Sequence, residues 1–433
     1  MQISPQTFTK YSRLPRLTVV SVGISFRNEE DRARLPRSFF SNSIRNPLMA
    51  RVNSTKRALT QVVDCLTGGL SVPLPNLPEE IIMEILLRLP VKALLRFRCV
   101  SKSWLSLISS PRFIKTHLRI SSKSNIYSHN RLVVGSGPLP MVFNTFSLCP
   151  NIDANSSMDN SVFDYPTSDM DDEIRIVGSC NGLVCVAVYP HTVVLWNPAT
   201  RKSKKLPVSD RYLSGLEYGF GYDASRDDYK VVESGWVFRD VEVYETQVKV
   251  YSWRADTWRT VDWPSGKILD GPGVFVNGAI HWKVYHGDSA SKWAVVAQNV
   301  TMDTCSSVEL PVCGSNDGNV MLGVSGGCLC ASYDYYSYMD VWVLKESGRK
   351  ESWMKLVCVP YFFCMRHNDH VRLKLLFVSE NGGVLLSLGS DLIMYKPSQY
   401  HEIHRLSNHV QVEAATYSES LLSPDFDPEL VWE

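Results

Sequence analysis

The sequence has no run of 18 or more apolar residues, the length that a membrane-spanning helix requires, so nothing in it predicts an anchor in a bilayer. It also lacks a P-loop, a dinucleotide-binding glycine pattern after a strand, and an H-E-x-x-H pair. Its eleven cysteines are odd in number and irregularly spaced, which argues against a secreted disulfide scaffold and indicates free thiols in a reducing compartment. These absences predict a soluble globular protein that performs none of the common covalent reactions.

Two patterns with catalytic or metal-binding potential remain, and neither is complete. Residues 323–327 satisfy the nucleophile-elbow pattern G-x-S-x-G, which requires a strand-to-helix turn, but they lie in a region predicted to contain only strands. A second group, whose spacing fits no zinc finger or ribbon, comprises Cys364, His367, His370, His401 and His404. We therefore expect no catalytic residue, no metal site and no cofactor.

The chain does have enough apolar residues for sizeable cores, since 44% of its 433 residues are hydrophobic and 11% are aromatic, and its length allows two or three domains. Residues 1–72 differ from the rest, because they carry eleven Lys and Arg against four Asp and Glu. With many Ser and Asn and no sustained period, this segment is predicted to be a disordered basic extension. Three alternatives stay open: a signal sequence, a transit peptide, or translation that starts at Met49.

Residues 77–118 form a compact helical module. Pro78 suits the first turn of a helix and Pro90 forces a stop, while apolar residues between them recur at helical spacing. A second apolar series continues to a break at Ser110-Pro111, so two or three short helices are predicted. A module of about 40 residues rarely buries enough apolar surface to be stable alone. We therefore expect it to dock on a partner; the alternative is a helical linker packed on the next domain.

After Leu118, short alternating apolar segments rich in Val, Tyr, Trp and Phe predict an all-β region of about 300 residues. Two landmarks repeat along it. An apolar residue followed by proline recurs after 57, 47 and 49 residues, at Leu206-Pro207, Trp263-Pro264, Leu310-Pro311 and Val359-Pro360. A tight glycine turn precedes an apolar strand at Gly182, Gly278, Gly327 and Gly382. About four strands in each period of roughly 45 to 50 residues are typical of a propeller blade.

The repeat predicts five continuous blades and one that is split. The continuous blades are expected at residues 176–207, 219–264, 274–311, 321–360 and 373–403. The sixth is expected to combine residues 131–146 with residues 412–423 and so to close the ring. A pair of β-sandwiches is the alternative, but sandwiches give no repeat of this length.

The helical module resembles a named family. The order Leu77-Pro78, Glu80, Ile85-Leu86, Leu89-Pro90, Leu94, Phe97, Val100, Lys102, Trp104 and Phe113 is similar to an F-box of the plant type, without a gap. The resemblance implies docking on a Skp-type adaptor, which bridges to the cullin and RING subunits of an SCF-type E3 ubiquitin ligase. The adaptor-binding residues that it implies are Leu77, Pro78, Ile82, Ile85, Leu89, Pro90, Leu94, Val100 and Trp104.

A second resemblance covers residues 125–425, where GSCNGLVCV, VVLWNPATRKSKKLP, YGFGYDASRDDYKVV and GVFVNGAIHW are similar to the plant F-box-associated domain, a kelch-like family. The expected fold is therefore an α+β multidomain protein in which a small all-α module precedes an all-β propeller of about six blades. Its expected parts are the basic extension (1–72), the F-box (73–118), the propeller (119–425) and a C-terminal tail (426–433).

These resemblances imply a non-catalytic ligase subunit, in the nucleus or cytoplasm, that selects a protein target for ubiquitination and proteasomal degradation. No nucleic-acid or membrane partner is expected. Two alternatives are a scaffold that binds the adaptor without a degradative role, and an enzyme on a kelch-like propeller, whose copper site would need Cys and His less scattered than these. Target contact is expected at a group of tyrosines, and the alternative is that these side chains pack between blades. The group comprises Tyr333, Tyr335, Tyr336 and Tyr338.

Overall fold

The computed structural model describes one helical module and one propeller, both within the compact unit Leu77–Glu433. The described residues are 79–123, 130–136, 142–147, 159–160, 174–189, 191–209, 213–240, 243–264, 267–286, 289–311, 319–335, 338–360, 373–378, 383–388, 391–395, 402–405 and 413–425. Among them, no helix combines the length and the apolar character needed to cross a membrane.

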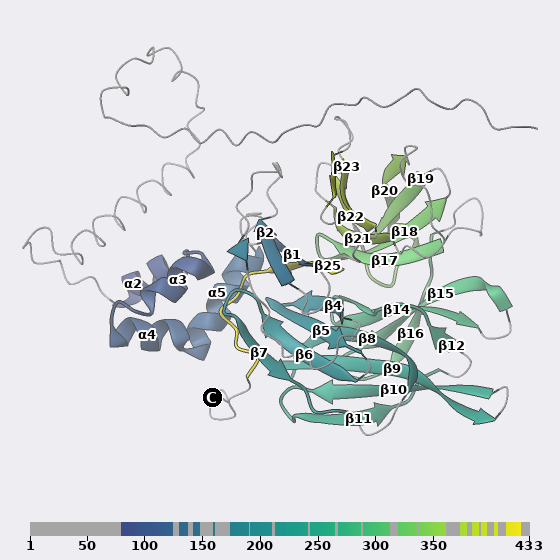
Figure 1. The fold of residues 1–433 in the computed structure, drawn as a ribbon, viewed down its shortest axis with the longest axis horizontal. Coiled ribbons are helices and arrows are strands. Elements are labelled where there is room, and N and C mark those ends of the chain that lie inside the picture. Colours follow the sequence, from purple (N-terminus) through teal and green to yellow (C-terminus); the bar gives the residue numbers. More distant parts are fainter. Residues whose placement is uncertain are drawn as a thin grey trace, which may run out of the picture. The chain divides into compact units, whose positions relative to one another are not determined.

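Four helices make up the helical module (Figure 1): α2 (Glu79–Leu86), α3 (Val91–Phe97), α4 (Lys102–Ser109) and α5 (Pro111–Lys123). The expectation of two or three helices was wrong, because the Ser110-Pro111 break is also the start of a helix. The Ser110 hydroxyl accepts a hydrogen bond from the Phe113 N–H (3.3 Å), and proline is favoured at the first position of a helix. In the same way, the Ser101 hydroxyl accepts from the Trp104 N–H (3.1 Å) at the start of α4.

The helices share one small apolar core. Its buried members are Leu86, Leu87, Val91, Leu94, Ile108 and Phe113, together with Leu421 from the far end of the chain. His117 of α5 is also buried, with its Nε2 2.9 Å from the Leu89 carbonyl oxygen, and burial lowers the pKa of its imidazole. A neutral histidine therefore joins α5 to the turn that follows α2.

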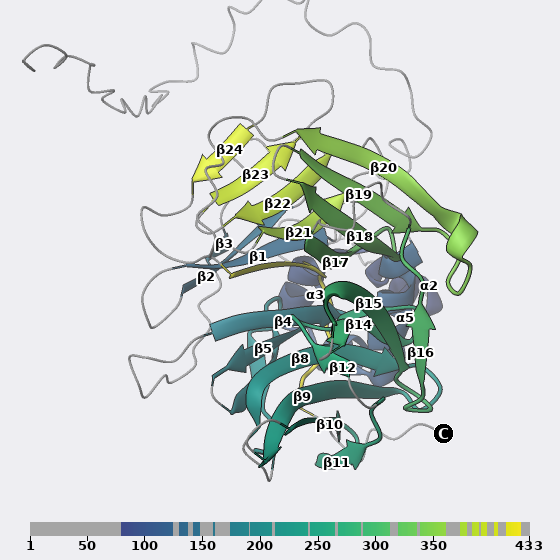
Figure 2. The same ribbon diagram turned by 90° about the vertical axis from the view of Figure 1, so that its right-hand side faces the viewer.

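Six antiparallel sheets follow and form a six-bladed propeller (Figure 2). In the order of the chain, they are β1 (Asn130–Ser136), β2 (Val142–Ser147), β3 (Asp159–Asn160) with β25 (Glu413–Ser418); β4 (Ile174–Cys180), β5 (Leu183–Val188), β6 (Thr192–Asn197), β7 (Lys202–Lys205); β8 (Ser214–Asp223), β9 (Asp228–Asp240), β10 (Val243–Ser252), β11 (Thr257–Val261); β12 (Lys267–Leu269), β13 (Val274–Val276), β14 (Ala279–His286), β15 (Ser289–Asn299), β16 (Cys305–Val308); β17 (Asn319–Ser325), β18 (Cys328–Tyr335), β19 (Tyr338–Leu344), β20 (Trp353–Pro360); and β21 (Leu373–Val378), β22 (Val384–Leu388), β23 (Asp391–Tyr395), β24 (Glu402–Arg405).

The ring is closed by the last strand. β25 pairs with β1 in an antiparallel register that runs from Asn130↔Ser418 to Gly135↔Glu413. The prediction of a split sixth blade is therefore confirmed. Because the closing strand comes from the end of the sequence, the described propeller is complete only when both ends of this region are present.

Apolar packing joins each blade to the next. Six hydrophobic clusters each combine residues of two neighbouring sheets, which is why a middle strand such as β5 is buried at every position. The strands in the middle of a blade are thus apolar on both faces, whereas an outer strand such as β7 is largely exposed.

One five-residue turn recurs in the blades, and the sequence analysis missed it. Its fifth residue is not glycine but has a positive φ, at Arg201 (62°), Asp227 (55°), Asp256 (53°) and Asp303 (57°). The first residue, four positions earlier, accepts a hydrogen bond from a following N–H through its side chain; these residues are Asn197, Asp223, Ser252 and Asn299. Short polar side chains stabilise such turns locally, so a polar residue four positions before an Asp was a usable signal for three of these four turns.

The blades have two different sides. Since each blade is antiparallel, the turns after its first and third strands lie on one side, which we call the turn side; it holds residues 181–182, 197–201, 223–227, 252–256, 277–278, 299–303 and 326–327. The turn between the second and third strands lies on the other, which we call the loop side. The helices contact the turn side, where Ala199 packs against their core and Lys115 of α5 forms an ion pair with Asp227.

Candidate docking surfaces

The helical module exposes a disproportionate share of large apolar side chains. Nine such side chains are exposed among the described residues, and four of them lie in this module: Ile81, Val100, Leu105 and Ile120. Ile81 and Leu105 are the most exposed of the four, at 44% and 46%. Soluble proteins rarely leave several large apolar groups exposed in so short a segment unless they bind something. Three of the four, Ile81, Val100 and Leu105, lie between the start of α2 and the end of α4, so this segment forms a candidate docking surface.

Among the residues that the resemblance implied for adaptor binding, those that the structure describes fall into three groups. Leu94 is fully buried, so in the free chain it belongs to the helical core. Ile82, Leu89 and Trp104 are half-buried against that core, and Ile85 is half-buried as well. Pro90 and Val100 are exposed, whereas Leu77 and Pro78 lie outside the described residues. Sequence reasoning did not include Ile81, although it lies one helical turn before Ile85, or Leu105.

The tyrosines on the loop side of the β17–β20 blade form a series from core to surface. Tyr333 is 7% exposed and its hydroxyl donates to the Pro311 carbonyl oxygen (3.2 Å). The Tyr335 ring centroid lies 6.5 Å from that of Tyr333 and 4.8 Å from that of Tyr338, which is 36% exposed. Tyr336 lies outside the described residues. Of this group, Tyr338 thus offers the most accessible side chain and Tyr333 serves packing.

Charged residues also gather at the loop-side ends of the inner strands. Lys374 of β21 lies 3.9 Å from Glu413 of β25, and Arg175 of β4 lies 3.9 Å from Glu217 of β8. The Arg175 guanidinium also lies over the ring of Tyr189, 4.8 Å from its centroid. Glu413 also accepts a hydrogen bond from the Ile176 N–H (3.1 Å), so these charged groups are held in place at the loop-side ends of the inner strands.

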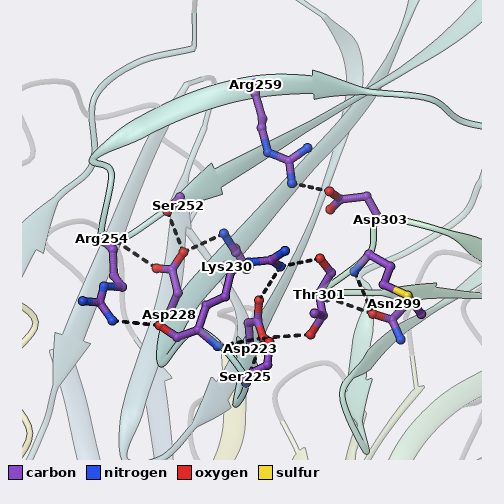
Figure 3. A network of polar contacts seen from close by, with 12 residues as sticks. Asp223, Ser225, Asp228, Lys230, Ser252, Arg254, Arg259, Asn299, Thr301 and Asp303 are labelled. Carbon is purple, nitrogen blue, oxygen red and sulfur yellow. Dashed lines mark hydrogen bonds and ion pairs between the residues drawn. The ribbon is translucent and has the colours of Figure 1, made fainter. Parts of the chain in front are cut away.

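A polar clamp joins the turn side of two neighbouring blades (Figure 3). Asp223, which is fully buried, accepts hydrogen bonds from the Ser225 N–H (3.0 Å) and from the hydroxyl of Thr301 (2.8 Å), a residue of the next blade. The Arg226 guanidinium bonds both Asp223 (3.0 Å) and the Thr301 carbonyl oxygen (2.5 Å), and Arg259 pairs with Asp303. Both carboxylate oxygens of Asp223 accept hydrogen bonds, so the clamp is a structural element rather than an open site.

The stability of this clamp is expected to depend on pH. Burial alone raises the pKa of Asp223, but the hydrogen bonds from Ser225, Thr301 and Arg226 outweigh it and lower the pKa from 3.8 to about 2. The stabilisation is therefore complete above the unfolded pKa and is lost as the pH falls toward about 2. We expect Asp223→Asn to lower the unfolding free energy at pH 6 by about 2 kcal/mol, since bonds to charged groups contribute about that much.

Urea unfolding of both proteins at pH 6 and at the lowest pH that keeps them folded measures this effect. Asp425→Asn, at an exposed position whose carboxylate lies 4.0 Å from Lys202, is the control and should change little at either pH. A difference between Asp223→Asn and wild type that grows as the pH falls would contradict the argument.

The nucleophile-elbow pattern has the wrong context for hydrolysis. Ser325 ends strand β17 and its hydroxyl donates to the Val378 carbonyl oxygen (3.2 Å), while Gly326 and Gly327 turn into another strand, β18. The described residues hold no cluster of three or more metal-binding side chains. Cys364, His367, His370 and His401, and the side chain of His404, lie outside the described residues.

A helical module with an exposed apolar surface, joined to a propeller that it contacts on the turn side, is the arrangement of a docking protein, in which the helices and the propeller offer separate surfaces. Comparison with known proteins is consistent with this class. Residues 74–116 match the F-box domain, and residues 122–420 match the F-box associated beta propeller domain. The chain belongs to the family of F-box proteins that carry an F-box associated beta propeller domain.

Several relatives come from Arabidopsis thaliana. The chain is 34% identical over 369 residues to an F-box/kelch-repeat protein, covering 81% of this chain and 96% of the relative. It is 27% identical over 350 residues to the F-box protein CPR1, covering 74% and 81%. A further F-box protein is 26% identical over 411 residues, covering 84% of this chain and 96% of the relative.

Proposed function

We propose that the chain is the substrate-recognition subunit of an SCF-type E3 ubiquitin ligase, in the nucleus or cytoplasm. The observation that carries this proposal is the set of exposed apolar side chains on α2 to α4, within the segment that matches the F-box domain. In this proposal these side chains dock on a Skp-type adaptor, and the adaptor bridges to cullin and RING subunits. We further propose functional boundaries at residues 73–118 for the F-box and 119–425 for the propeller.

Ubiquitin transfer is then performed by other subunits. The chain raises the effective concentration of a protein target beside the loaded conjugating enzyme, which accelerates transfer without a catalytic residue in this chain. The helices contact the turn side, so we propose that the target binds on the loop side. There Tyr335 and Tyr338 supply aromatic anchoring area, and the charged ends of the inner strands supply polar contacts.

Titration of purified residues 73–433 with a purified Skp-type adaptor tests the docking step. Saturable binding with one adaptor per chain is expected. A folded protein that binds no member of the adaptor family would overturn the ligase assignment. If the chain binds the adaptor but deletion of residues 77–118 changes the turnover of no protein, the chain is a scaffold without a degradative role.

Mutation of the exposed tyrosine tests the target side. We expect Tyr338→Ala to weaken target binding by about fivefold to thirtyfold, as loss of an interface anchor typically does. Quantitative proteomics first identifies the proteins whose abundance falls when the wild-type chain is expressed. Expression of Tyr338→Ala in place of wild type should leave the abundance of these proteins higher. Met302→Ala is the control, because Met302 is 66% exposed but lies on the turn side. Recognition at Tyr338 is contradicted if both variants leave these proteins equally abundant, or if neither variant raises their abundance above the wild-type level.

A further inference from the structure

The residues that follow the closing strand lie between the helices and the propeller. We call residues 419–425 the C-terminal strap. Two adjacent leucines of the strap enter different cores: Leu421, 3% exposed, is buried with Leu86, Leu94, Ile108 and Phe113 of the helices, whereas Leu422 packs against the cluster between the β4–β7 and β8–β11 blades. The strap therefore contributes one side chain to each of the two parts.

The propeller holds the backbone of the strap through side-chain donors. Asn197 is fully buried, and its Nδ2 donates to the carbonyl oxygens of Ser420 (3.0 Å) and Leu422 (2.6 Å). The Trp253 Nε1 donates to the Pro424 carbonyl oxygen (2.7 Å). At the start of the strap, Glu419 pairs with Arg131 of β1 at 2.9 Å. The carbonyl groups of Ser420 and Leu422, the residues on either side of Leu421, are thus held in place. This orients the side chain of Leu421.

Close packing under the strap requires a glycine. Gly182, in the turn between β4 and β5, has a φ of +85°, a conformation that favours glycine. A Cβ at this position would lie 2.2 Å from the Ser420 hydroxyl oxygen and 2.7 Å from the Ser418 carbonyl oxygen. The turn and the strap therefore pack so closely that position 182 has no room for a side chain.

The helices have a second attachment to the propeller, independent of the strap. Lys115 of α5 donates to Asp227, whose other carboxylate oxygen accepts from the Tyr222 hydroxyl (2.5 Å). The hydrogen bond to Asp227 adds to the effect of burial and raises the pKa of that tyrosine. Two attachments on different helix-facing segments resist rotation of the helices better than one flexible linker does.

We propose that the C-terminal strap is a structural part of the F-box. Leu421 completes the helical core, and Asn197 positions Leu421. The strap thereby holds the adaptor-docking surface in a fixed relation to the loop side of the propeller. This inference rests on the proposed function for its consequence, the fixed placement of a target relative to the adaptor. The packing that it asserts is testable without any partner.

Hydrogen exchange of the full chain without adaptor, for wild type and Leu421→Ala, is the first measurement. Truncation of a buried leucine typically shifts a local opening equilibrium by about 30-fold or more, so amide exchange in α2 to α5 is expected to accelerate by at least that factor. Protection in β4 to β6 should stay within about threefold of wild type. Leu421→Met, which nearly conserves volume, should restore most of the protection in the helices.

The neighbouring leucine supplies the matched control. Leu422→Ala is expected to accelerate exchange in the strands of the two blades that it contacts and to leave α2 to α5 unchanged. The proposal is overturned if Leu421→Ala leaves exchange in the helices unchanged, or if it accelerates exchange in the blades as much as in the helices.

A second arm connects the strap to docking. With a purified Skp-type adaptor, we expect Leu421→Ala to weaken binding at least about tenfold and Leu422→Ala to weaken it less than about twofold. If the wild-type chain binds no adaptor while Leu421→Ala still accelerates exchange selectively in α2 to α5, the ligase assignment fails and the strap inference stands. If binding is normal in wild type and unchanged in Leu421→Ala, the role of the strap in docking is refuted.

Discussion

The double substitution Ile81→Asp, Leu105→Asp is expected to weaken adaptor binding by at least about a hundredfold, because each removes an apolar anchor and places a charge in a dry interface. Both side chains are exposed in the free chain, at 44% and 46%, so the helices should remain folded. Isothermal titration with the adaptor measures the loss, and circular dichroism checks the fold. This separation of binding from folding is what makes the pair informative.

Matched controls sharpen that experiment. Met302→Asp introduces the same charge at an exposed apolar position outside the helical module and should leave the affinity unchanged. By contrast, Trp104→Ala acts on a side chain that packs against the helical core, with its ring centroid 5.5 Å from that of Phe97. We expect that variant to lose stability as well as affinity. Unaltered binding by the double aspartate variant would remove α2 and α4 from the docking surface.

Trp282→Ala is expected to lower the unfolding free energy of the propeller by about 3–5 kcal/mol, the range for removal of a buried aromatic side chain. Trp282 is fully buried between two blades, and a Cβ added at Gly219 or Gly273 would lie only 2.9 or 2.8 Å from its ring carbons. Its Nε1 donates to the Gln298 Oε1 at 3.2 Å. The substitution therefore creates a cavity and also removes a buried hydrogen bond.

Trp282→Phe separates these two effects, because it retains most of the ring but removes the donor. Its expected loss is about 1–2 kcal/mol plus a smaller cavity contribution. The Gln298 Nε2 already has no hydrogen-bond partner among the described residues, so loss of the tryptophan leaves a buried amide with neither of its atoms paired. Urea unfolding followed by circular dichroism measures both variants; an alanine variant as stable as wild type would show that the blades repack around the space.

The blade order was predictable because strand repeats are spaced along the sequence in the order in which they occupy the ring. The split blade was also predictable, since β1 and β25 both carry apolar residues that no continuous blade had used. The start of α5 was missed although Ser110-Pro111 is a helix-start signal, because the same pair also suits a helix end.

The division of apolar residues between core and surface was not predictable. Leu94 and Leu105 both occur in one apolar helical series, yet Leu94 is fully buried and Leu105 is 46% exposed. Periodicity gives the apolar face of a helix but not which part of that face a neighbouring helix covers. The same limit applies to Leu421 and Leu422, whose separate cores depend on the path of the backbone through the Asn197 contacts.

Closure of the ring by β25, followed directly by the strap, has a consequence for inheritance. A chain that ends before Glu413, as from a premature stop codon, lacks both the closing strand and Leu421. If the strap completes the F-box core as proposed, that core is unfilled in such a chain, and we expect the chain to compete poorly with intact relatives for a Skp-type adaptor. We therefore expect nonsense alleles of this gene to be recessive, whereas substitutions confined to the loop side leave adaptor binding intact and are expected to be dominant negative.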